Sequence, residues 1–260
     1  MKQIRYTIFL GGLIILVLAL GFIFQAPFAT GMWPWPDGRL SYLFIGSILA
    51  AVSAAALWIG WSGELSALPA GALNVFVIAA MSSFYFFQLV LQDGRVDLLP
   101  SGAVALLMVF ASSVSFLWSR RLPITESRST PLPVRISFGI FLVSLVLSGG
   151  ALIFRLPIFP WTLNPDSSVI FGCIFLGDAF YFLYGLLYPR WSNGIGQLLS
   201  FLAYDLVLIG PFFALLGTVT PEKKLGLIVY LAVLLYSGGL AVYYLFIDSR
   251  TRDWRIHKTG

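Results

Sequence analysis

Eight long runs of apolar residues, separated by short polar segments, limit this chain to very few folds. The runs cover residues 7–24, 40–61, 72–91, 102–118, 136–154, 167–188, 196–217 and 225–247. Each is close to the roughly 20 residues that a helix needs to cross the hydrocarbon core of a bilayer. Spanning segments must satisfy their own backbone hydrogen bonds, and uninterrupted apolar runs do so as helices. The sequence therefore predicts an all-α polytopic membrane protein with eight transmembrane helices.

The low content of charged residues supports the same class of protein. Asp, Glu, Lys and Arg make up 10% of the chain, whereas about 25% is usual for a soluble domain. The single cysteine, Cys173, excludes an intrachain disulfide, and the single histidine, His257, argues against multi-histidine metal and haem sites. The chain has no Gly-rich phosphate-binding motif. We therefore expect no metal, no cofactor and no nucleic-acid partner, and we expect membrane lipids around the chain.

The two halves of the chain align with each other. Three pairs of segments match in order: residues 4–27 with 134–157, 33–35 with 159–161, and Gly46 with Gly172. The first pair is offset by 130 positions and the other two by 126. The alignment predicts a tandem duplication of a four-helix unit, with repeats at residues 1–130 and 131–260. The first apolar run then corresponds to the fifth, so we expect it to be retained rather than cleaved as a signal peptide.

An even number of spans in each repeat has two consequences for topology. Both repeats enter the membrane from the same side, so a pseudo-two-fold axis along the membrane normal would relate them. Of the 16 basic residues, eleven lie on the side of the two termini: Lys2, Arg5, Arg120, Arg121, Arg128, Arg135, Arg190, Arg250, Arg252, Arg255 and Lys258. The other five are Arg39, Arg95, Arg155, Lys223 and Lys224. This bias predicts cytoplasmic N- and C-termini in the cell (inner) membrane.

Asp178 and Asp205 lie deep inside apolar runs. A polar turn at residues 189–194 separates the two runs that carry them. Each Asp lies roughly 20 Å along its helix from the middle of this turn, at about 1.5 Å of rise per residue. In an antiparallel pair of helices, the two acids would share one depth near the middle of the membrane. An ionisable residue at that depth predicts a functional site.

Three interpretations of the two acids stay open. As a functional pair they share a proton, bind a cation, or act as acid and base on a lipid-borne substrate, because two close carboxylates in a low-dielectric environment cannot both stay ionised. As structural acids, each is protonated or hydrogen-bonded, with Tyr181, Tyr184 or Tyr204 as the partner. In the third interpretation they face different ways and never meet. Position along a helix sets depth but leaves the direction of each side chain open.

Pro211 lies inside the seventh apolar run, one to two helical turns beyond Asp205. A proline within a helix removes one backbone hydrogen bond and bends the helix. We expect a kink there, with a packing role or with a role in opening a cavity or a hinge.

Trp33, Trp35 and Trp161 lie in aromatic-Pro-Trp loops that recur at the same place in each half. Tryptophan is enriched at the interface between a bilayer and water. We expect these residues to anchor the loops at that interface, with a lid over an outward cavity as the alternative.

The aromatic-Pro-Trp loops, with GDAFYFLYGLLYPRW at residues 177–191 and GQLLSFLAYDLVLIGPF at 196–212, resemble a set of uncharacterised bacterial multi-pass membrane proteins. The resemblance covers most of the chain. It implies a membrane location and a multi-pass topology, and it assigns a role to no residue.

Three functional hypotheses follow from the two acids. In the first, the protein binds or translocates a small or lipid-like ligand at Asp178 and Asp205, and replacing either by Asn changes binding without loss of folding. In the second, it is an accessory subunit of a larger membrane complex, the acids are structural, and a membrane-protein partner co-purifies. In the third, it is an intramembrane enzyme that acts on a lipid or isoprenoid, with a closed apolar pocket touching at least one Asp.

Overall fold

The structure, a computed structural model, describes residues 2–126 and 128–252. Eight helices within them are long and apolar enough to cross a membrane, and no β-strand forms among them. The prediction of an all-α polytopic membrane protein is therefore confirmed. Arg255, His257 and Lys258, which entered the predictions above, lie outside the described residues.

The long helices are α1 (Lys2–Ile23), α3 (Arg39–Ser62), α4 (Leu68–Asp93), α5 (Leu99–Ser119), α6 (Leu132–Ile153), α7 (Pro165–Leu187), α8 (Trp191–Leu215) and α9 (Pro221–Val242). Four short elements accompany them: α2 (Pro27–Thr30), the 3-10 turns η1 (Leu65–Ala67) and η2 (Val96–Leu98), and the π-helix η3 (Tyr243–Ile247).

Local sequence explains where several helices begin and end. Asn164 Oδ1 accepts a hydrogen bond of 2.9 Å from the amide of Asp166, and Pro165 opens α7. This is a favoured start, because the cap satisfies a free amide and proline lacks one. Gly63 and Gly94 follow α3 and α4 with φ of 80° and 67°. Glycine adopts this left-handed conformation without steric cost and so ends a helix.

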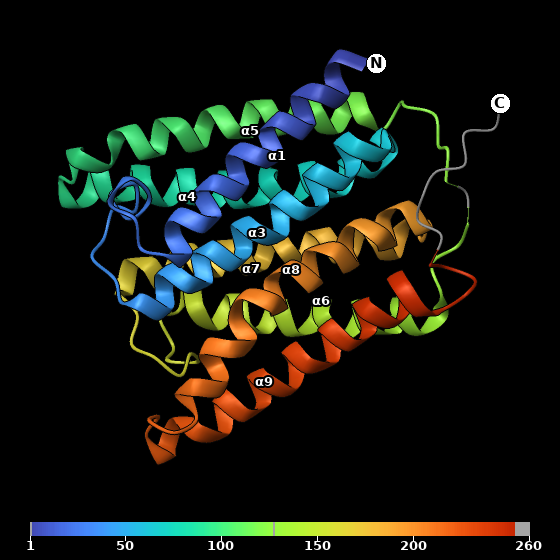
Figure 1. The fold of residues 1–260 in the computed structure, drawn as a ribbon. Helices are drawn as coiled ribbons and strands as arrows, with labels where there is room; N and C mark the ends of the chain where they lie inside the picture. The colour runs from blue at the N-terminus through green and yellow to red at the C-terminus, as the bar shows by residue number, and fades with distance from the viewer. Residues whose placement is uncertain (1, 127, 253–260) are drawn as a thin grey trace.

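The long helices form two layers (Figure 1). In one layer α1, α3, α8 and α9 lie side by side, and in the other α5, α4, α7 and α6 follow the same order behind them. The contacts of α3 with α8 and of α4 with α7 join the first four long helices to the last four. Aromatic rings pack across the space between the layers: the ring centroids of Phe44 and Phe171 are 4.8 Å apart, and those of Phe141 and Phe201 are 4.6 Å apart.

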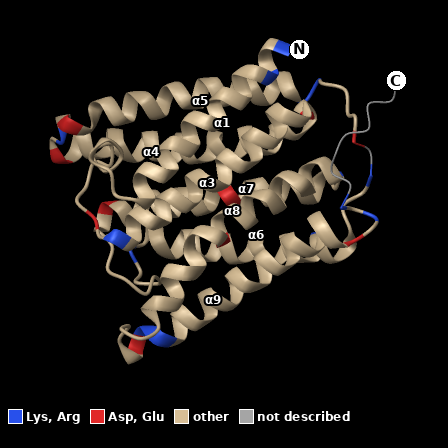
Figure 2. Ribbon diagram, viewed as in Figure 1, with Lys and Arg blue, Asp and Glu red and all other residues tan. Residues whose placement is uncertain are grey.

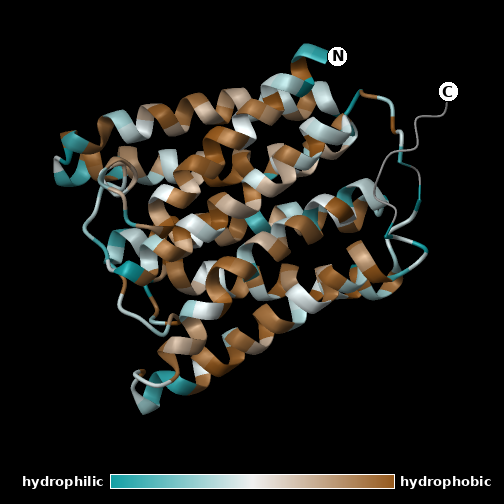
Figure 3. Cartoon of the chain, viewed as in Figure 1, coloured by the Kyte–Doolittle hydropathy of each residue, from teal (hydrophilic) through white to brown (hydrophobic). Residues whose placement is uncertain are grey.

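The start of α1 and the end of α9 lie at the same end of the molecule (Figure 1). Lys, Arg, Asp and Glu gather at the two ends of the helices, apart from acidic residues in the middle (Figure 2). Hydrophobic residues cover the length between the two ends (Figure 3), and many are large and exposed, such as Leu107, Phe110 and Leu147. Such a continuous exposed apolar surface is what a bilayer covers.

The hairpin formed by α7 and α8 differs from the expected antiparallel pair. Helix α8 already begins at Trp191, so the connection is shorter than the predicted turn at residues 189–194. The two helices touch beside it, where Gln197 Nε2 donates to the carbonyl of Tyr181 at 2.7 Å. They then separate, because α7 packs on α6 and α4 whereas α8 packs on α3 and α9. Helices α7 and α8 therefore do not stay closely packed along their length.

Some local geometries recur in the two halves at the offsets found in the sequence. Gln25 and Arg155, 130 positions apart, both have a positive φ, at 54° and 59°. Gly46 and Gly172 face Ile23 and Ile153 so closely that a Cβ on either glycine would lie 2.7 Å from the isoleucine Cγ1. These similarities agree with a duplication, which stays a prediction.

Candidate functional site

A cavity of about 980 Å³ lies between the two layers and is lined by residues of α3 to α9. We call it the interlayer cavity. Its walls are mainly aliphatic and aromatic, with twelve polar side chains among them. The polar lining residues are Asn74, Ser112, Ser115, Ser144, Ser148, Asp178, Tyr181, Ser200, Tyr204, Asp205, Tyr230 and Ser237. Both acids identified from the sequence therefore reach one cavity.

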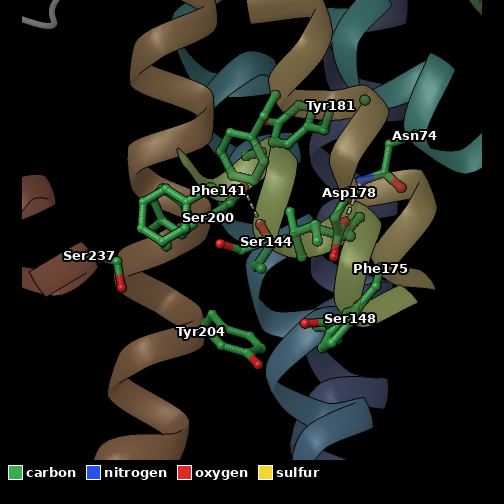
Figure 4. Close-up of a pocket in the computed structure, with 18 of the residues that line it drawn as sticks. Asn74, Phe141, Ser144, Ser148, Phe175, Asp178, Tyr181, Ser200, Tyr204 and Ser237 are labelled. Atoms are coloured by element: carbon green, nitrogen blue, oxygen red, sulfur yellow. Dashed lines mark hydrogen bonds between the residues drawn. The ribbon is translucent and has the colours of Figure 1, made fainter. Parts of the chain in front are cut away.

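Asp178 lies in the middle of α7 and is held by α4. Asn74 Nδ2 donates a hydrogen bond of 2.7 Å to Asp178 Oδ1 (Figure 4). The neighbouring Gly177 makes this approach possible, because a Cβ there would lie 2.9 Å from the carbonyl oxygen of Asn74. The side chain of Asp178 is only half-buried although it is in the middle of a packed helix. We attribute that exposure to the interlayer cavity, which Asp178 lines.

Asp205 lies in the middle of α8 and is almost fully buried, with 3% of its surface exposed. Ser237 Oγ on α9 donates to Asp205 Oδ2 at 2.8 Å. The other carboxyl oxygen, Oδ1, is buried without a hydrogen-bond partner. Gly238 leaves room for this carboxyl, because a Cβ there would lie 3.3 Å from Oδ2.

The two acids belong to opposite walls of the cavity rather than to one hydrogen-bonded pair. Each has a partner of its own, and no hydrogen bond joins the two carboxyl groups in the part of the chain that the structure describes. The partners are Asn74 and Ser237, not the tyrosines considered from the sequence. Tyr181 lines the cavity, and the hydroxyl of Tyr204 forms a hydrogen bond with that of Tyr230.

Several lining residues were missed by reasoning from the sequence. Asn74 and Ser237 hold the acids, and Ser144, Ser148 and Ser200 add hydroxyl groups to the walls. Asn74 gave a usable signal, since an amide within an apolar run needs a partner inside the membrane. The serines gave none, because serine is also common in membrane helices for close packing.

Three residues that line the interlayer cavity also have a large exposed fraction. Met108 on α5, Leu147 on α6 and Val229 on α9 line it, yet these residues are 49%, 69% and 55% exposed. All three lie in the middle part of their helices.

Pro211 lies inside α8, which continues past it to Leu215. It is not among the residues that line the interlayer cavity. The sequence-based prediction of a kink at this position stays a prediction.

Two of the three loop tryptophans form hydrogen bonds between the two halves of the chain. Trp33 Nε1 donates to Ser167 Oγ at 3.1 Å, and Trp161 Nε1 donates to Ser41 Oγ at 3.1 Å. Trp35 is 3% exposed and stacks on Phe86 with 5.7 Å between ring centroids. Trp33 and Trp161 therefore tie one half to the other, whereas Trp35 packs within the first half. The role of all three as bilayer anchors stays a prediction.

Comparisons of this chain with protein-family models, with curated proteins and with solved structures found no match.

Proposed function

We propose that the protein binds a small apolar or lipid-like ligand in the interlayer cavity, with Asp178 and Asp205 as its polar contacts. One observation carries this proposal: both intramembrane acids line a single cavity whose walls are otherwise mainly apolar. Its volume of about 980 Å³ falls at the upper end of the range of about 300–1,000 Å³ that is usual for ligand pockets. A few polar groups on apolar walls are also usual in such pockets.

The exposure of three lining residues supports entry of the ligand from the bilayer. Met108, Leu147 and Val229 combine cavity lining with surface exposure at mid-helix. A ligand dissolved in lipid would meet these residues without first crossing the charged ends of the helices. The ligand class is therefore one that partitions into membranes.

The proposed setting is the cell (inner) membrane with cytoplasmic termini. The excess of Lys and Arg on the side of the termini supports this orientation. We also propose that residues 1–130 and 131–260 are tandem repeats. The matching positive φ of Gln25 and Arg155, and the matching contacts of Gly46 and Gly172, support that origin.

A cavity-filling substitution tests the proposal. Ser144→Phe places a ring in the interlayer cavity from α6, whereas Val143→Phe, on the same helix, adds its ring at a position that is 58% exposed and does not line the cavity. Each variant and the unmodified chain are purified in lipid nanodiscs, and bound small molecules are identified by native mass spectrometry. We expect the unmodified chain and Val143→Phe to retain a ligand and Ser144→Phe to lose it.

Circular dichroism and thermal unfolding show whether both variants stay folded. If Ser144→Phe retains the ligand as well as the unmodified chain does, the cavity is not the binding site. If no variant carries a ligand and one protein co-purifies with all of them, the accessory-subunit hypothesis is favoured instead.

A further inference from the structure

The polar side chains that line the interlayer cavity include acids but no basic residue among the described residues. They are hydroxyl groups, two carboxyl groups and one amide, and the described lining residues include no Lys, Arg or His. The cavity can therefore compensate a positive charge but has no group that would compensate a negative one. A buried charge without a counter-charge is strongly unfavourable, so the lining favours a cationic ligand over an anionic one.

We propose, resting on the function proposed above, that the ligand is a membrane-partitioned amine whose nitrogen binds to Asp178 while its apolar part fills the cavity. Asp178 is the accessible acid, since it is half-buried and lines the cavity, whereas Asp205 is 3% exposed. The hydrogen bonds of the described residues use only Oδ1 of Asp178. Its second oxygen is available to a donor from the ligand.

The surroundings of Asp178 suit an ammonium group in particular. Asn74 Oδ1 is buried without a hydrogen-bond partner beside the Asn74 amide nitrogen that binds Asp178. An ammonium carries several N–H donors, so it can bind the carboxylate and satisfy this oxygen after a small movement. Aromatic residues line the same cavity, among them Phe175, Tyr181 and Tyr204 (Figure 4). The faces of such rings attract cations.

An amine can also reach the cavity through lipid in its neutral form, without a net charge. A neutral amine that enters from the bilayer accepts the carboxyl proton: an O–H bond breaks, an N–H bond forms, and an ammonium carboxylate pair results. An amine that enters already protonated pairs with the carboxylate and gives the same pair. The first route brings no net charge into the cavity, so the desolvation cost stays with a single hydrogen-bonded ion pair.

The test uses photoactivatable analogues of dodecylamine, dodecanol and dodecanoate that share one diazirine-bearing chain and differ only in the head group. Each is added to liposomes that contain the full-length protein, crosslinked by light, and mapped by mass spectrometry. We expect saturable labelling of cavity residues by the amine at roughly ten- to hundredfold lower membrane concentration than by the alcohol, which is the size of one hydrogen bond to a charged group. We expect no saturable labelling by the carboxylate.

Asp178→Asn is the matching variant, because its amide still offers an oxygen to Asn74 Nδ2 while the charge is lost. We expect it to reduce the advantage of the amine over the alcohol to about threefold or less, which corresponds to a neutral hydrogen bond. Asp97→Asn is the control. Asp97 is an exposed acid in η2, just after the C-terminal end of α4, and it pairs with Arg95. This substitution should leave the advantage of the amine over the alcohol unchanged. The head-group ranking on the unmodified chain does not depend on the folding of any variant.

The outcomes separate the two proposals. Equal labelling by amine and alcohol would contradict the proposal that the ligand is an amine, and so would an advantage of the amine that persists in Asp178→Asn. Either result would leave the proposed ligand binding in the cavity unaffected. If Ser144→Phe lowers the labelling of cavity residues for none of the three head groups, both the amine proposal and the proposed ligand binding in the cavity are contradicted.

Discussion

Asp178 and Asp205 each depend on one side chain from a neighbouring helix. Both acids could be predicted from the sequence as candidate site residues, because an ionisable residue within an apolar run is costly and therefore informative. It did not find Asn74 or Ser237 as their partners, because the direction of a side chain around a helix depends on packing that a run of apolar residues does not encode. For the same reason, the sequence left open whether the two acids meet.

Removing the hydroxyl group of Ser237 should destabilise the protein. Ser237→Ala leaves the buried carboxyl of Asp205 without its partner, and an unsatisfied buried polar group costs about 1–3 kcal/mol. Ser113 is the control, because its hydroxyl donates only to the Val109 carbonyl of its own helix, at 2.7 Å. Thermal unfolding in detergent should show a lower Tm for Ser237→Ala and almost no change for Ser113→Ala. Equal Tm values for the two variants would mean that the bond between Ser237 and Asp205 contributes nothing.

At the scale of helices, the apolar runs predicted the elements well but not their partners. All eight predicted spans overlap a long helix, because run length is a direct measure of what crosses hydrocarbon. The separation of α7 from α8 was not predictable in this way. It follows from close contacts such as that of Gly177 with Asn74, which bring α7 to α4 instead.

A methyl group at Gly177 should separate α7 from α4. A Cβ there would lie 2.9 Å from the Asn74 carbonyl oxygen and 3.0 Å from Asn74 Oδ1, so Gly177→Ala forces the helices apart. Overpacking of this kind costs about 1–3 kcal/mol, and the bond between Asn74 and Asp178 should lengthen.

Gly139→Ala on α6 is the matched control, because a Cβ there meets nothing within 4 Å. Alanine favours a helix over glycine by about 0.5–1 kcal/mol, so this variant should be as stable as the unmodified chain or slightly more stable. Thermal unfolding compares the two. A Gly177→Ala protein as stable as Gly139→Ala would show that the contact between α4 and α7 can yield without cost.

At the scale of the whole molecule, the two halves are joined by reciprocal contacts. Trp33 of the first half donates to Ser167, and Trp161 of the second half donates to Ser41. The two serines are 126 positions apart, as are Gly46 and Gly172. The recurrence of the tryptophans was visible in the sequence and led to the prediction of an anchor at the bilayer interface. Their contacts with the other half were not predictable, because a loop sequence does not show which surface it will pack against.

The two tryptophan contacts should be energetically coupled. The ring of Phe44 lies 6.2 Å from Trp161 and 4.8 Å from Phe171, and Phe171 lies 5.7 Å from Trp33, so one aromatic cluster connects them. Trp33→Phe and Trp161→Phe each remove one hydrogen bond and should each cost about 0.5–1.5 kcal/mol. Because residues that share a packed cluster are not independent, the double variant should depart from the sum by about 0.5 kcal/mol or more.

Trp35→Phe separates the loss of the hydrogen bond from the loss of ring size. Its indole nitrogen is buried and has no partner, so this substitution removes a ring but no hydrogen bond and relieves an unsatisfied donor. The free energy of unfolding of all four variants, measured by denaturant titration in mixed micelles, completes the comparison. If Trp33→Phe and Trp161→Phe cost no more than Trp35→Phe, the serine contacts do not hold the halves together. If the loss of stability in the double variant equals the sum of the losses in the single variants, the aromatic cluster does not link the two contacts. Each contact then stabilises the junction of the halves independently of the other.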